Sequence, residues 1–89
     1  MKITKIEAIW CSGCLVMKKV WKEVAKEYPN IEITTYDYDM DPEMVQKYNV
    51  GTILPVIIFQ NGNEEKRLIG ERTKDEVVNA IKEMQWVIK

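Results

Sequence analysis

The stretch that decides the fold is residues 3–25, ITKIEAIWCSGCLVMKKVWKEVA. It begins with a short segment of mixed polarity, residues 3–8, which is typical of a β-strand. From Met17 onward, apolar residues recur at helical spacing, and lysines and glutamates lie between them. The only two cysteines of the chain, Cys11 and Cys14, therefore fall where a predicted strand gives way to a predicted helix.

The next segments continue this strand–helix pattern. The Pro-Asn pair at 29–30 ends the first helix, and residues 31–38, rich in β-branched and aromatic side chains, predict a second strand. The sequence Asp-Pro-Glu at 41–43 predicts the start of a short second helix that is capped by Asp41. We expect this helix to end near residues 49–51.

The second half of the chain predicts a hairpin followed by a helix. The apolar run 56–59, which follows Pro55, is typical of a strand buried on both faces. The Asn-Gly pair at 61–62 predicts a tight turn into a returning strand over 64–69. The Thr-x-x-Glu sequence at 73–76 has the form of a capping box. The helix behind it has one apolar face: Val77, Ile81, Met84 and Ile88.

The predicted order of elements is β-α-β-α-β-β-α. By the rules of layer packing, this order favours an α/β fold with a four-stranded mixed sheet, flanked by three helices on its two faces. The chain has 89 residues, which we expect to form a single domain over residues 1–89.

Composition and charge exclude several classes of function. The chain has 13 Lys+Arg and 14 Asp+Glu, without the basic excess that is typical of nucleic-acid binding. No apolar stretch approaches the ~20 residues that a membrane span needs. Charges also appear too early at the N-terminus for a signal peptide. We therefore expect a cytoplasmic protein that binds neither nucleic acid nor membrane.

The two cysteines carry the chemistry that the composition allows. The chain has no histidine, so a Ser-His or Cys-His nucleophilic pair is excluded within it. Cys11 is predicted at the amino terminus of the first helix, where free N–H groups and the helix dipole favour a thiolate. Cys14 lies one turn further along, where it can attack a mixed disulfide formed on Cys11. The spacing thus predicts a reversible two-electron switch.

Other sites that use C-x-x-C remain as alternatives. Zinc and iron–sulfur sites need more ligands than this pair, and the chain has no third cysteine and no histidine. A metal would therefore need carboxylates or a second chain, as in a non-catalytic metal-bridging module. A purely structural disulfide would add little stability, because so short a loop hardly constrains the unfolded chain. The last alternative is that the two cysteines are buried and chemically inert. We expect no metal and no cofactor.

The motif and several later segments resemble the thioredoxin family. Residues 10–14, Trp-Cys-Ser-Gly-Cys, resemble the active-site segment of that family. Asp39-x-Asp41-Pro42 is similar to the segment after its second strand, and Leu54-Pro55 to its cis-proline loop. Gly70 is similar to the glycine before its last helix. The resemblance covers about residues 3–84.

The resemblance implies a protein thiol–disulfide oxidoreductase with a substrate groove beside the cysteines. Pro55 is then expected to be cis and to face the cysteine pair. The backbone of Leu54 is expected to pair with an extended substrate peptide, while Trp10, Gly13 and Gly70 line the same groove. The implied partners are disulfide-containing proteins and an electron donor, either of the thioredoxin-reductase type or based on glutathione. We expect the protein to act as a monomer.

The sequence also departs from the family pattern. Many thioredoxins carry a buried aspartate on the strand before the motif, which takes a proton from the second cysteine. Here that position is Lys5, and the nearest carboxylate is Glu7, which is a candidate proton acceptor or else a solvated edge charge. The chain is short enough to resemble a glutaredoxin, so a glutathione-dependent reductase is an alternative. Gly70-Glu71-Arg72, which replaces the Gly-Gly-Asp of glutaredoxins, favours a protein disulfide.

Overall fold

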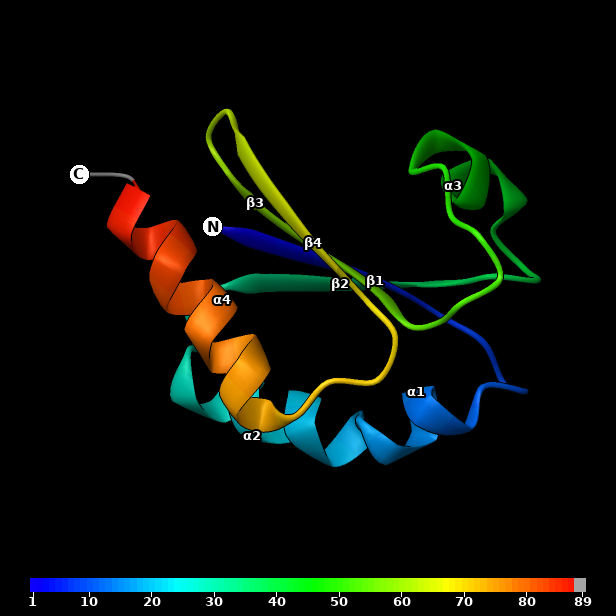
Figure 1. Cartoon of the computed structure of the whole chain (residues 1–89), viewed down its shortest axis with the longest axis horizontal. Coiled ribbons are helices and arrows are strands. Elements are labelled where there is room, and N and C mark those ends of the chain that lie inside the picture. The colour runs from blue at the N-terminus through cyan, green and yellow to red at the C-terminus, as the bar shows by residue number, and fades with distance from the viewer. Residues whose placement is uncertain (88–89) are drawn as a thin grey trace.

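The computed structural model describes residues 1–87, with side chains as far as residue 84. Its elements follow the predicted order, and the expected first helix is present as two consecutive helices (Figure 1). In chain order they are β1 (Lys2–Glu7), α1 (Ser12–Val16), α2 (Lys18–Glu27), β2 (Glu32–Asp37), α3 (Pro42–Lys47), β3 (Val56–Asn61), β4 (Glu64–Ile69) and α4 (Lys74–Val87).

The four strands form one mixed sheet in the order β2-β1-β3-β4. Strand β1 pairs in parallel with β2 on one side and antiparallel with β3 on the other. Strands β3 and β4 form the predicted hairpin, and Gly62 takes a positive φ of 63° in its turn. Because β1 has a partner on both edges, the segment that leads to the cysteines starts from a fixed position in the sheet. The predicted fold class is confirmed.

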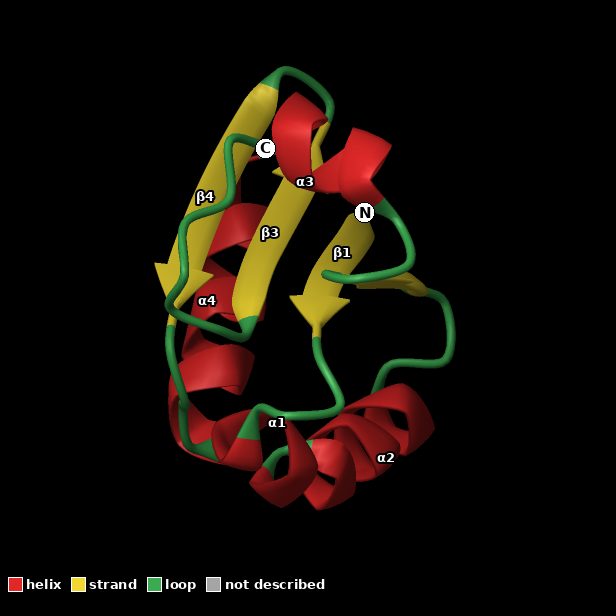
Figure 2. Ribbon diagram, turned by 90° about the vertical axis from the view of Figure 1, so that its right-hand side faces the viewer, coloured by secondary structure: helices red, strands yellow, loops and turns green. Residues whose placement is uncertain are grey.

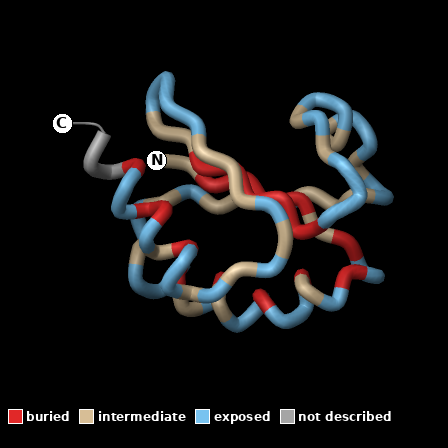
Figure 3. Tube along the Cα trace, viewed as in Figure 1, coloured by how far each residue is buried: buried red, intermediate tan, exposed pale blue. Residues whose placement is uncertain are grey.

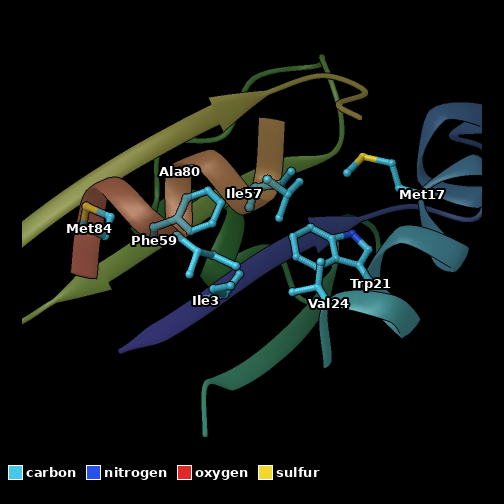
Figure 4. Packing of buried hydrophobic residues seen from close by; sticks show 10 residues of the cluster. Ile3, Met17, Trp21, Val24, Ile57, Phe59, Ala80 and Met84 are labelled. Carbon is cyan, nitrogen blue, oxygen red and sulfur yellow. The ribbon is translucent and has the colours of Figure 1, made fainter. Parts of the chain in front are cut away.

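Helices cover both faces of the sheet, with α4 behind it and α3 in front (Figure 2). Buried residues lie mainly on the central strands β1 and β3 and on the inner faces of the helices, while the hairpin tip is exposed and α3 has no fully buried residue (Figure 3). On the face of α2 and α4, Ile3, Ile57 and Phe59 pack against side chains of both helices (Figure 4). Removing a fully buried side chain of this kind from water is worth about 1.5–3 kcal/mol relative to leaving it exposed.

The second face holds a separate apolar cluster that contains both cysteines. Ile6, Val56 and Ile58 from the two central strands form its base. Cys11 and Cys14 pack on these side chains, so apolar contacts hold the cysteine motif against the sheet. Residues of α3 and its flanking loops close the cluster: Val45, Tyr48 and Val50.

The expected first helix is interrupted at Met17. Met17 has φ −79° and ψ −5°, and its N–H points to the carbonyls of both Gly13 and Leu15. The Met17 side chain is fully buried, and its Sδ accepts a hydrogen bond of 3.3 Å from the backbone N–H of Arg72. The interruption thus coincides with a contact to the loop before α4.

The predicted helix caps have different outcomes. Thr73 and Glu76 form the expected capping box at α4, with reciprocal bonds of 3.2 Å. Asp41, by contrast, does not cap α3 with its side chain. Its Oδ2 instead accepts a 2.9 Å hydrogen bond from the backbone N–H of Asp37, which fixes the end of β2. Ile88, expected on the apolar face of α4, lies outside the described residues.

Beneath the motif, β1 carries a buried ion pair. Lys5 Nζ lies 3.4 Å from the Glu7 carboxylate, and the two side chains are 10% and 19% exposed. The same ammonium lies 4.8 Å from the centre of the Trp21 ring, a distance at which the cation is attracted to the ring face. Glu7 is therefore an inward-facing, paired group, and the reading of it as a solvated edge charge is wrong.

Replacing Lys5 with methionine should destabilise the protein, because it leaves the Glu7 carboxylate largely buried without its cation. We expect the free energy of unfolding to fall by about 2 kcal/mol. Urea denaturation at pH 7 measures this loss.

The double variant Lys5→Met, Glu7→Gln is the matched control, since it removes both charges together. It should recover most of the stability that the single variant loses. An equal loss in the two variants would mean that the ion pair does not account for the effect.

Candidate active site

Cys11 is both the cap of α1 and the first cysteine of the motif. Its backbone is extended, with φ −89° and ψ 108°, and its N–H donates to the Ala8 carbonyl at 3.1 Å. The Cys11 Sγ accepts a 3.2 Å hydrogen bond from the backbone N–H of Cys14. The Cys11 sulfur therefore takes the position that an oxygen takes in an ordinary helix cap. This placement at the helix start agrees with the sequence prediction.

Cys14 is more deeply buried than Cys11, and its pKa is raised. The two cysteines are free thiols, with 8% exposure for Cys11 and 3% for Cys14. The pKa of the Cys14 thiol is raised to about 12, chiefly by burial and then by its hydrogen bond with Cys11 and the charges of Cys11 and Glu7, while a hydrogen bond with the Ala8 backbone lowers it. Cys14 is therefore a protonated thiol at neutral pH.

A cavity of about 320 Å³ connects Cys14 with Glu7. Both residues line it, and Lys18, Asp37 and Asp41 contribute to its polar part. The structure therefore brings the candidate proton acceptor Glu7 to the same space as Cys14. Its rim includes Ile9, which is 84% exposed, so this space is accessible from solvent.

The loop before β3 and the end of β4 meet at the motif. The Leu54–Pro55 peptide bond is cis, in agreement with the expectation. Leu54 packs in the same cluster as both cysteines. Gly70 has a positive φ of 93°, and its N–H donates to the Pro55 carbonyl at 2.9 Å. Pro55 is therefore hydrogen-bonded to Gly70, and Leu54 packs with the two cysteines.

Trp10 directly precedes Cys11 in the chain, and its ring is held by contacts with the β2–α3 loop. Its Nε1–H donates to Asp39 Oδ2 at 2.8 Å, and its ring makes an edge contact with Tyr38, with 5.8 Å between centroids. The residue is still 57% exposed. Trp10 therefore presents a fixed apolar surface next to the nucleophile position.

Gly13 lies at a close approach between two segments of the chain. A Cβ at this position would lie 3.3 Å from Glu71 Cβ, 3.5 Å from Glu71 Oε1 and 3.9 Å from Cys11 Sγ. The first distance is tighter than ordinary packing, so a side chain here would displace Glu71. The structure therefore places Gly13 between the nucleophile position and the loop that follows Gly70.

Two residues of the site were not assigned from the sequence. Asp39 holds Trp10, and Glu71 covers Gly13. The Asp39-x-Asp41-Pro42 pattern is a signal that could have indicated the first. The position of Glu71 directly after Gly70 could have indicated the second.

Metal ligands do not gather in the described part of the chain. Among these residues, no three His, Cys, Asp or Glu side chains lie close enough to hold an ion together. The helices described here also include none with the length and apolar character needed to cross a bilayer.

Comparison with known proteins agrees with this geometry. The family model described as Thioredoxin matches residues 2–83. The chain belongs to the thioredoxin family. It is 32% identical over 78 residues to a thioredoxin of Chlamydia trachomatis, with 88% of this chain and 76% of that protein covered. It is also 35% identical over 68 residues to a Mycobacterium leprae bifunctional thioredoxin reductase/thioredoxin, covering 75% of this chain and 15% of that one.

A solved structure shows the same fold over nearly the whole chain. Thioredoxin 1 of Thermosipho africanus superimposes with a TM-score of 0.83 at 27% identity, covering 98% of this chain and 97% of that one. This thioredoxin-family protein is therefore a thiol–disulfide oxidoreductase acting on protein disulfides. The glutathione-dependent and metal-bridging alternatives are not favoured by these comparisons.

The two thiols should differ sharply in reactivity. Because the pKa of Cys14 is raised to about 12, this thiol stays protonated as the pH rises from 7 to 9. We expect a brief pulse of iodoacetamide to label Cys11 alone in the folded dithiol protein. Peptide mass mapping measures the site of labelling.

The same pulse in concentrated urea should label both cysteines, because unfolding returns Cys14 to water. Equal labelling of the two cysteines in the folded protein would contradict the assigned difference between them.

Proposed function

We propose that Cys11 is the nucleophile and Cys14 the resolving cysteine. The observation that carries this proposal is the asymmetry of the pair: the Cys11 sulfur receives the N–H of Cys14, while burial keeps the Cys14 thiol protonated. The Cys11 thiolate attacks one sulfur of a substrate disulfide and releases the other as a thiolate. Cys14 then attacks the Cys11 sulfur of the mixed disulfide. Two electrons pass to the substrate, and a Cys11–Cys14 disulfide remains.

The second step needs a group that removes the proton of Cys14, and Glu7 fits this role. It lines the same cavity as Cys14, and its charge contributes to the raised pKa of that thiol. Lys5 holds the carboxylate at the base of the motif. The proton can pass from Glu7 to the solvent of the cavity, while the leaving thiolate of the substrate takes a proton from water.

The proposed substrate groove runs across the surface above the cysteines. Trp10 and Gly13 border Cys11 on one side, and Leu54, Pro55 and Gly70 belong to the loops that meet it. An extended peptide can pair with the backbone at Leu54, which fixes its disulfide over the nucleophile. This arrangement supports protein disulfides as substrates over small thiols.

The oxidised pair must be reduced again by an external donor. We propose a donor of the thioredoxin-reductase type, because the Mycobacterium leprae relative is a bifunctional thioredoxin reductase/thioredoxin. A glutathione-based donor is the second candidate. We further propose that residues 1–89 form one domain, acting as a cytoplasmic monomer in electron transport and redox homeostasis.

The two cysteine variants should have different phenotypes. Cys14→Ser should retain attack by Cys11 but lose resolution, and therefore accumulate a mixed disulfide with the substrate. Cys11→Ser should lose turnover of insulin disulfides altogether. Non-reducing mass spectrometry measures the adduct, and insulin reduction with excess dithiothreitol measures turnover. Equal, mild losses in the two variants would contradict the assigned roles.

The Glu7→Gln variant tests proton transfer in the second step. We expect resolution of the mixed disulfide to slow by about tenfold or more, while the first attack by Cys11 keeps its rate. Stopped-flow mixing with a peptide disulfide, followed by acid quench and mass analysis, separates the two steps.

The Lys5→Met, Glu7→Gln double variant separates proton transfer from stability, since it removes the unpaired lysine that Glu7→Gln leaves behind. Slow resolution in both variants supports the proton-transfer role. A return of the rate to that of the wild type, together with stability, would show that Glu7 acts only through folding.

A further inference from the structure

The large apolar side chains exposed in the described structure lie next to the site residues in sequence. Ile9 and Trp10 precede Cys11, and Leu15 and Val16 follow Cys14. The others are Met40 in the loop that holds Trp10, Ile53 before Leu54, and Ile69 before Gly70. Exposed apolar side chains in the segments that flank a site are typical of a surface that binds another protein. Apolar contacts of this kind do not by themselves distinguish one polypeptide from another.

Glu71 adds a charge to this surface, next to the nucleophile. Its Oε1 and the Cys11 Sγ both lie within 4 Å of the position that a Cβ on Gly13 would occupy, so they border the same methyl-sized space. The residue is exposed and takes part in none of the ion pairs found among residues 1–84. Its negative charge is therefore available to a bound substrate.

The basic residues that follow Glu71 in the chain form ion pairs with other carboxylates. Arg72, the next residue, donates to Glu76 Oε2 at 3.1 Å and to the Ile69 carbonyl at 2.8 Å. Lys74 pairs with Glu23 and Glu27 on α2. These contacts hold both basic side chains in ion pairs with other carboxylates, so neither of them is paired with Glu71.

Other charges around the motif do not reverse this balance. Lys18 lines the cavity beside Cys14, but Asp37 and Asp41 line the same cavity, together with Glu7, whose charge is paired with Lys5. Asp39, which accepts the hydrogen bond from Trp10, adds another carboxylate near the motif. The motif is therefore surrounded by more negative than positive charge.

We propose that Glu71 is a specificity-determining residue that selects disulfide substrates carrying a positive charge beside the attacked sulfur. This inference rests on the proposed function and names its substrate class: polypeptide disulfides flanked by lysine or arginine. A cation at this position is attracted to Glu71 when the substrate sulfur reaches Cys11, and an anion is repelled. The bonds that form and break are those of the exchange described above, so only the rate of attack changes.

Three small disulfides that differ in charge test this inference. Cystamine carries two ammonium groups, dithiodipropionate two carboxylates, and hydroxyethyl disulfide no charge at pH 7. Pre-reduced protein is mixed with excess of each at low salt, and the loss of protein thiols is followed by acid quench, alkylation and mass. No external reductase is needed, because a single turnover is measured.

The Glu71→Gln variant should attack cystamine about threefold more slowly and dithiodipropionate about threefold faster than the wild type, as expected for one charge at this separation in water-like surroundings. The ratio of the two rates then falls roughly ninefold. The Glu71→Lys variant should lower the ratio further. The rate with the neutral disulfide should stay within about twofold of the wild type, and the charge effects should shrink at ~0.5 M salt.

Glu64→Gln is the matched control, because it removes the same charge at the hairpin tip, at the far end of the molecule from α1 (Figure 1). It should leave the ratio unchanged. An unchanged ratio in Glu71→Gln, or the same change in both variants, would overturn the inference while leaving the proposed function intact. If the wild type reduces insulin disulfides but none of the three small disulfides, this inference fails and the proposed function stands; if it reduces none of the four, the proposed function fails as well.

Discussion

The hydrogen bond from the Cys14 N–H to the Cys11 sulfur is the interaction on which the active site depends. It makes one side chain serve as helix cap and as nucleophile, so the start of α1 and the reactive sulfur cannot move independently. The cap is effective only because β1, held between β2 and β3, delivers the chain to this point. The sheet therefore fixes the geometry of the chemistry through a few residues of connecting loop.

The buried pair of Lys5 and Glu7 gives this thioredoxin-family protein an unusual charge arrangement beneath its cysteines. A lysine stands where many thioredoxins carry an aspartate, and the carboxylate has moved two residues along the same strand. Residues two apart on a strand point to the same face, so both groups still lie under the motif. The Lys5 ammonium also lies 4.8 Å from the centre of the Trp21 ring, whose face attracts a cation. This arrangement keeps a carboxylate near Cys14 while balancing its charge.

The sequence was sufficient to predict the strands, the hairpin and the place of the cysteines, because each depends on local patterns. The Asn61-Gly62 turn and the Thr73–Glu76 capping box are set by a few adjacent residues, and both formed as expected. The apolar run 56–59 was predicted to be buried on both faces, and it is. The resemblance to thioredoxins supplied the cis Leu54–Pro55 bond, which spacing alone does not indicate.

Features that depend on distant contacts could not be predicted. The interruption at Met17 coincides with a bond from Arg72, and no proline or glycine marks it in the sequence. Asp41 looked like a helix cap, but the end of β2 competes for its carboxylate. The contact of Glu71 with Gly13 joins residues far apart in the chain. Such contacts follow from how the loops meet, which the local pattern does not encode.

The most direct test of the central claim is the redox equilibrium of Cys11 and Cys14 against a series of glutathione buffers, with free thiols alkylated and counted by mass. The account predicts one cooperative transition in which both thiols disappear together, as a two-electron couple forms an intramolecular disulfide. Independent glutathione adducts on the two cysteines, or no reversible transition at all, would contradict it.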